Sequence, residues 1–124
     1  MMLLVDTAIW VDHIRRPDND LVRFLNSELV LIHPFVMGEI ALGRIKNLGV
    51  FLARLGKLPK ALVARPTEVL EFIRNGDLAG SGIGYVDAHL LAAAALTAET
   101  LIWTRDKRLL AVARSLSLAV EMGE

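Results

Sequence analysis

The sequence of 124 residues contains no cysteine. Disulfide bonds, thiolate zinc sites and cysteine nucleophiles are therefore excluded together. It also lacks a long apolar run. The longest uncharged apolar stretch, residues 88–98, is far shorter than the roughly 18 to 20 residues that a membrane-spanning helix needs. We therefore expect no membrane segment.

The first residues have no basic region and reach an acid at Asp6. They predict a first strand and not a signal peptide, so we expect a cytoplasmic protein. The length falls in the usual range for one compact domain that can bury a continuous core. Residues 1–124 are accordingly expected to form a single domain.

Neither sign of charge is in excess, because fourteen basic residues balance fourteen acidic ones. Their distribution is uneven: no acid lies between Glu39 and Glu68. Such a basic segment is either a solvated helical face or a rim that contacts phosphates. Hydrophobic residues make up 54% and mean hydropathy is +0.47, which suggests apolar surface for a dimer or an obligate partner. The basic residues of the segment are Arg44, Lys46, Arg54, Lys57, Lys60 and Arg65.

Short apolar runs alternate with helical patterns along the chain. The alternation predicts a three-layer α/β/α fold, with a mostly parallel sheet of about four to five strands and helices on both faces. The expected strands are residues 2–5, 29–32, 61–64, 101–103 and 118–120. The expected helices are residues 7–16, 18–25, 34–45, 47–55, 67–75, 85–97 and 106–115, the second capped by Asp18.

Two acids follow strands in this pattern. Asp6 ends the first strand, and Asp106 comes three residues after the strand at 101–103. Open α/β sheets bind ligands beyond the carboxyl ends of their strands, which favours a site there. The alternative is that each aspartate only caps the helix that follows it.

Two further acids stand in apolar surroundings. Glu39 is the only charge in residues 35–42, where a buried carboxylate would need a cation, a hydrogen bond or water. Asp87 lies in the first turn of the expected helix at 85–97. Its alternative is an acid favoured there by the helix dipole.

If Asp6, Glu39, Asp87 and Asp106 converge, their mutual repulsion calls for a divalent cation. Ligation by carboxylates without cysteine, and without histidine at a ligand-like spacing, favours Mg²⁺ or Mn²⁺ over zinc. Such an ion activates water for phosphoryl chemistry. A threonine stands one or two residues from two of the acids, and both hydroxyls are expected to orient carboxylates or water. These threonines are Thr7 and Thr104.

Four segments resemble, in order and spacing, the four acidic blocks of VapC-type PIN domains. They are Val5-Asp6-Thr7 with Trp10 after it, Gly38-Glu39-Ile40, YVDAHL at 85–90 and WTRDKRL at 103–109. The resemblance spans the whole chain. It implies a PIN-like fold and a Mg²⁺-dependent endoribonuclease that arrests growth, is held inactive by a VapB-type antitoxin and commonly forms a homodimer.

Carried over to this sequence, the resemblance makes Asp6, Glu39, Asp87 and Asp106 the catalytic, metal-binding acids. The glycine-rich loop at 80–84 departs from the family pattern and leaves substrate preference open. The apolar residues of the expected helical hairpin form either a groove for an antitoxin helix or ordinary core. They are Val50, Phe51, Leu52, Leu55 and Leu58. Nearby basic residues, Arg44 and Lys46 first, are expected to hold the RNA backbone.

Three other interpretations of the sequence have requirements of their own. A receiver domain needs an adjacent acidic pair after its first strand, where this chain has Asp6-Thr7. A nucleotide-binding module is suggested only by the glycines at 80–84, which follow a helix and not a strand. A non-catalytic PIN-like scaffold that binds RNA or protein stays open. His33 and His89 are interpreted as packed or surface histidines with no catalytic role.

Overall fold

A parallel sheet forms the centre of the fold. The computed structural model describes residues 1–122. In the sheet, β1 (Met2–Val5) lies between β2 (Val30–Leu31) and β3 (Thr100–Trp103). Both neighbours run parallel to β1, with Leu4 opposite Leu31 and Val5 opposite Trp103. The central strand is wholly apolar from Leu3 onward and fully buried, as expected for a strand covered on both faces.

The outer strands expected at 61–64 and 118–120 shrink to single bridges. Lys60 pairs with Ile32 at one edge, and Ala119 pairs with Ile102 at the other. Within residues 1–122 the sheet therefore has three strands, fewer than the four to five expected. At the first edge the reason is visible, because the Leu62 amide donates to the Thr97 hydroxyl (2.9 Å) and so leaves the sheet.

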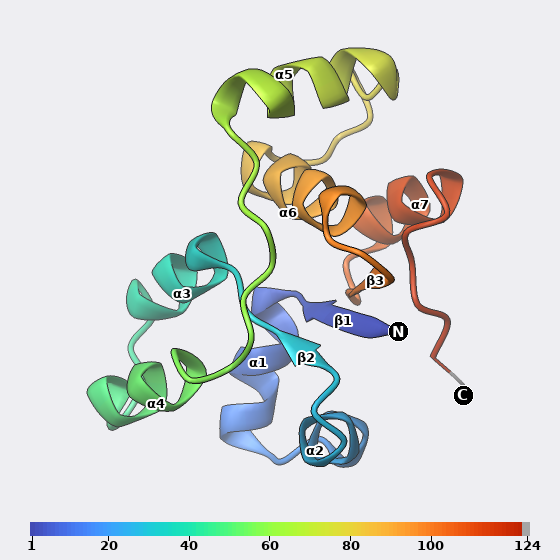
Figure 1. Ribbon diagram of the computed structural model, residues 1–124. Coiled ribbons are helices and arrows are strands. Elements are labelled where there is room, and N and C mark those ends of the chain that lie inside the picture. Colours follow the sequence, from blue (N-terminus) through green and yellow to red (C-terminus); the bar gives the residue numbers. More distant parts are fainter. Residues whose placement is uncertain (123–124) are drawn as a thin grey trace.

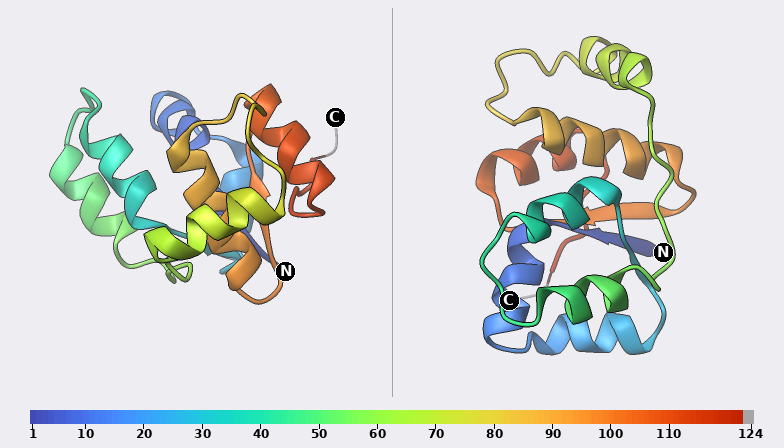
Figure 2. Two further views of the ribbon diagram at one scale, coloured as in Figure 1. Left: turned by 90° about the horizontal axis from the view of Figure 1, so that it is seen from above. Right: turned by 90° about the vertical axis from the view of Figure 1, so that its left-hand side faces the viewer.

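The helices cover both faces of this sheet (Figure 1). α1 and α2 lie on one side and α6 and α7 on the other, while α5 packs against the outer side of α6 (Figures 1 and 2). This arrangement confirms the expected three-layer α/β class. The helices of the described residues are α1 (Thr7–Arg15), α2 (Asn19–Asn26), α3 (Pro34–Ala41), α4 (Leu48–Leu55), α5 (Pro66–Asn75), α6 (Tyr85–Leu96) and α7 (Lys107–Ser115).

The prediction of a helix over residues 34–45 is wrong at the carboxyl end of the helix. α3 stops at Ala41, and the Gly43 amide turns back to the Ile40 carbonyl (3.0 Å). Asn47 then adopts a left-handed backbone conformation (φ 56°) before α4 begins. Asparagine tolerates this conformation better than most residues, so the chain can fold back here, and α3 and α4 pack together.

α6 is the most deeply buried helix. Alanines fill much of its length and let it lie close to both the sheet and α5. Leu90 and Leu91 join the main core with Ile9 and Trp10 of α1. Each buried side chain of this size stabilises the fold by about 1.5 to 3 kcal/mol. None of the helices within residues 1–122 has the length and apolarity needed to cross a membrane.

Candidate active site

Two aspartates meet at the carboxyl end of the sheet. Asp6 follows β1 and caps α1, its Oδ1 accepting from the Thr7 amide (2.8 Å). Asp106 follows β3 and caps α7, its Oδ1 accepting from the Leu109 amide (2.9 Å). β1 and β3 are adjacent and parallel, so the two caps lie at the same edge. Capping and a shared site are thus compatible, because a cap uses only one of the roughly four lone-pair positions that an ionised carboxylate offers.

The pKa of the Asp87 carboxyl is affected by all three of the other predicted acids. Asp87 is the third residue of α6, half-buried, and its Oδ2 accepts from the Gly84 amide (3.2 Å). Burial raises the pKa of the Asp87 carboxyl, the Gly84 hydrogen bond opposes this, and the nearby carboxylates of the other three acids raise it further. Those acids are Asp6, Asp106 and Glu39. Asp87 therefore lies within electrostatic range of the other three predicted acids, and we refer to these four residues as the acid cluster.

Glu39 differs from its expected environment. The side chain is exposed, whereas Val36 and Ile40 carry the buried face of α3. The interpretation of Glu39 as a buried charge is therefore wrong, because the apolar neighbours in sequence point into the core. Its Oε1 accepts from the Thr7 hydroxyl (2.6 Å), which ties α3 to the start of α1.

Both predicted threonines hold carboxylates. Thr7 bonds Glu39 through its hydroxyl and Asp6 through its amide. Thr104 is buried and donates its hydroxyl to Asp6 Oδ2 (2.7 Å), while its Oγ1 accepts from the Asp106 amide (3.1 Å). Through these bonds the two threonines link the Glu39 carboxylate, the Asp6 carboxylate and the backbone amide of Asp106.

Arg44 and Lys46 lie apart from this network. Both are exposed in the turn between α3 and α4, and within residues 1–122 neither forms an ion pair with the acids. Of the apolar residues predicted to form a partner groove, Leu55 is buried and only Val50 is largely exposed. The others pack partly against the core, so core packing accounts for most of that set.

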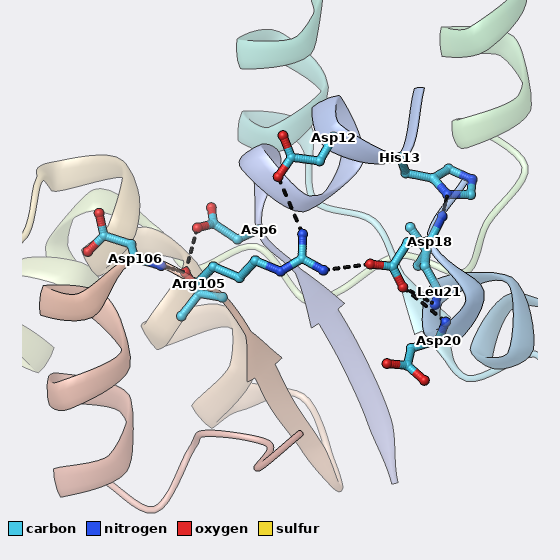
Figure 3. Close-up of polar contacts among 9 residues, drawn as sticks. Asp6, Asp12, His13, Asp18, Asp20, Leu21, Arg105 and Asp106 are labelled. Atoms are coloured by element: carbon cyan, nitrogen blue, oxygen red, sulfur yellow. Dashed lines mark hydrogen bonds and ion pairs between the residues drawn. The ribbon is translucent and has the colours of Figure 1, made fainter. Parts of the chain in front are cut away.

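Arg105 is a residue that sequence reasoning missed. It lies between Thr104 and Asp106, yet its guanidinium reaches Asp12 of α1 and Asp18, the N-cap of α2 (Figure 3). The only signal in the sequence was its position inside an acidic block. Its partners are 93 and 87 residues away in the chain, so no local pattern reveals them.

His33 and His89, interpreted from the sequence as packed or surface histidines, both lie in the interior. His33 is fully buried, and its Nδ1 accepts from the Phe35 amide (3.0 Å) to cap α3. Burial and the neighbouring His89 lower the pKa of His33 to about 4. Burial also lowers the pKa of His89. Both rings are packed in the interior, in agreement with the sequence interpretation.

The fold has three layers around a parallel sheet, and aspartates follow two of its strands. Comparison with known families identifies the class of protein to which these features belong. Residues 3–115 match the PIN domain family model, and the chain belongs to this family. It is 41% identical over 119 residues to Ribonuclease VapC32 from two strains of Mycobacterium tuberculosis, covering 96% of both chains. The resemblance to VapC-type PIN domains is thereby confirmed.

A shorter match involves a protein of another kind. The chain is 30% identical over 66 residues to the DNA mismatch repair protein MutS of Bartonella henselae. This match covers 53% of the chain but only 7% of MutS. So short a segment carries no argument about activity.

PIN ribonucleases generally depend on divalent metal ions, so the fit of this site to a cation can be assessed. Within residues 1–122, no three acidic or histidine side chains lie close enough together to hold an ion as they stand. The donor set nevertheless fits a hard cation, because every donor is a carboxylate or hydroxyl oxygen. The repulsion acting on Asp87 is the charge imbalance that a divalent cation would relieve.

Proposed function

We propose that this chain is a Mg²⁺-dependent endoribonuclease that hydrolyses RNA phosphodiester bonds as the toxin of a VapBC toxin–antitoxin pair. The ribonuclease class follows from the family and from the likeness to Ribonuclease VapC32. The single observation that carries the site is the placement of Asp6 and Asp106 at the ends of two adjacent parallel strands, with Asp87 near enough that these acids and Glu39 help to raise its pKa. Such shifts concentrate at functional sites.

In this proposal Asp6, Glu39, Asp87 and Asp106 hold the ion, with Mn²⁺ as a substitute. When bound, a cation of this kind lowers the pKa of a water molecule and neutralises charge on phosphate oxygens. The choice of Mg²⁺ rests on the all-oxygen donor set and on the absence of cysteine.

The chain's own residues would then position the acids and exclude competing arrangements. Thr104 and Thr7 hold the Asp6 carboxylate and the Glu39 carboxylate in fixed orientations. Hydrogen-bonded neighbours of this kind raise metal affinity by fixing ligand geometry. Arg44 and Lys46, exposed beyond the end of α3, are proposed to contact the RNA backbone.

The partners are proposed on the same basis. An antitoxin of the VapB type would bind this chain and keep it inactive, because the homologue is a VapC protein. We also propose that the toxin forms a homodimer and acts in the cytoplasm, where its RNA substrate is found. A PIN-like scaffold that binds RNA or protein without cutting it is the alternative.

The direct test is cleavage of a structured RNA by the purified chain. Cleavage should occur with Mg²⁺ or Mn²⁺, stop with EDTA and fall at least 100-fold in Asp87→Asn, as expected for loss of a metal-binding acid. Asp77→Asn is the matched control, because Asp77 is exposed and lies outside the acid cluster. Equal activity of both variants would contradict the proposed site. Absence of cleavage by the unaltered chain would favour the scaffold.

A further inference from the structure

The segment between β3 and α7 sends its side chains to two different places. Thr104 is buried and bonds Asp6, and Asp106 caps α7. Arg105 lies between them, and its side chain points away from Asp6 and Asp106, toward α1 and α2 (Figure 3). A change in the position of Arg105 would therefore also move Thr104 and Asp106, which flank it.

Arg105 is held by two carboxylates and an aromatic ring. One guanidinium nitrogen lies 3.3 Å from Asp12 Oδ2 and the other 2.5 Å from Asp18 Oδ2. The guanidinium carbon stands 5.7 Å from the centre of the Trp103 ring, within cation–π range. The group is thus fixed in position although its side chain is 47% exposed.

Asp18 is itself firmly anchored. Its Oδ1 accepts from the Asp20 and Leu21 amides, and its own amide donates to His13 Nδ1 (2.9 Å). Burial alone would raise the pKa of the Asp18 carboxyl, but hydrogen bonds from the Leu21 amide and the Arg105 guanidinium hold it below its ordinary value. Asp18 therefore presents a charged, pre-oriented oxygen to Arg105.

We propose that Arg105 is a positioning residue that fixes Thr104 and Asp106 in the acid cluster by tying their loop to Asp12 and Asp18. The inference rests on the proposed function for its effect on catalysis, but not for its effect on the loop. Partly exposed ion pairs contribute little to global stability, so the main consequence lies in local order. The guanidinium is already occupied by two carboxylates, which argues against a direct contact with RNA.

The first test needs neither metal nor substrate. The Asp106 amide donates to Thr104 Oγ1, so its hydrogen exchange in the metal-free protein reports the order of the loop. In Arg105→Ala this exchange should become about tenfold faster, with the midpoint of thermal unfolding nearly unchanged. Arg114→Ala is the matched control, because Arg114 makes a similar ion pair with Glu121. Unchanged exchange at Asp106 in Arg105→Ala would overturn the proposal.

The second test separates positioning from RNA binding. Arg105→Ala should lower kcat about tenfold or more and weaken Mn²⁺ binding, with little change in KM, because supporting residues of metal ligands have effects of this size. Arg105→Lys should restore part of kcat. Asp18→Asn, which preserves the helix cap, should add little to Arg105→Ala, because the two residues act as one unit.

The outcomes distinguish this proposal from the proposed function. A higher KM with a weaker salt dependence and an unchanged kcat would make Arg105 an RNA contact and overturn the positioning role. If the unaltered chain neither binds Mn²⁺ nor cuts RNA, the proposed function fails. The exchange of the Asp106 amide then still decides whether Arg105 positions the loop.

Discussion

Thr104 and Asp6, 98 residues apart in the chain, are joined by a 2.7 Å hydrogen bond from the threonine hydroxyl to Asp6 Oδ2. The other oxygen of Asp6 accepts from the Thr7 amide, so both oxygens of this carboxylate are held. Because Thr104 Oγ1 also accepts from the Asp106 amide, one hydroxyl sets the relation between two of the acids. The order of the acid cluster therefore depends on neutral as well as charged side chains.

Replacing Thr104 by valine should remove this bond at nearly constant volume. Asp6 Oδ2 and the Asp106 amide would lose a partner, which costs about 1 to 3 kcal/mol of unfolding free energy for a buried group. RNA cleavage should fall 10- to 100-fold. Urea unfolding and initial rates measure the two effects, and Thr104→Ser is the control that keeps the hydroxyl. Full activity of Thr104→Val would show that the bond is dispensable.

Asp87→Asn should make the metal-free protein more stable at neutral pH while abolishing cleavage. The folded pKa of Asp87 is raised, so the unfolded chain loses its proton first as pH rises, and stability falls through the interval above the ordinary carboxyl pKa. The asparagine amide oxygen can still accept from Gly84.

Thermal melts in EDTA measure this effect. The variant should melt a few degrees higher than the unaltered chain at pH 7, and the gap should close as pH falls below the ordinary carboxyl pKa. Mg²⁺ should raise the melting temperature of the unaltered chain alone. A variant that is less stable at pH 7 would mean that the Gly84 hydrogen bond outweighs the repulsion.

His33 should make the fold sensitive to acid. Its pKa is lowered from 6.5 to about 4, so between these pH values the unfolded chain binds a proton at His33 that the folded chain does not bind. Stability should fall as pH drops from 6.5 to about 4, by up to about 3 kcal/mol for this group. His33→Asn keeps an acceptor for the Phe35 amide and should show a shallower pH dependence in urea unfolding. Identical slopes in both proteins would exclude His33 as the cause.

Arg44→Gln combined with Lys46→Gln should raise KM for RNA without lowering kcat. Each lost phosphate contact should reduce the slope of log affinity against log salt by about 0.7 for single-stranded RNA. Filter binding at several salt concentrations measures the slope. Lys60→Gln is the control, because the Lys60 ammonium is bonded to the Gly56 and Leu58 carbonyls. An unchanged slope in the double variant would remove these residues from the RNA interface.

The acid positions could be predicted because they depend on local rules. A buried apolar strand followed by an N-capping aspartate describes both Asp6 and Asp106, and parallel neighbours bring their ends together. The caps and the cluster are the same residues. Asp87 could be predicted by a different local rule, as an acid in the first turn of α6.

Other features depend on contacts between distant segments and could not be predicted. The strand expected at 61–64 ends because Leu62 bonds Thr97, 35 residues later. Glu39 is exposed because α3 turns its apolar face inward and ends at Ala41, which composition alone does not define. Arg105 escaped notice since Asp12 and Asp18 are brought to it only by folding.

We propose that the four carboxylates together hold a divalent ion for RNA cleavage. Mn²⁺ binding measured by electron paramagnetic resonance tests it most directly, on the unaltered chain, Asp87→Asn and Asp77→Asn. We expect binding to the unaltered chain and to Asp77→Asn, with affinity lowered at least about tenfold in Asp87→Asn. Equal affinity in all three proteins, or no binding to the unaltered chain, would contradict it.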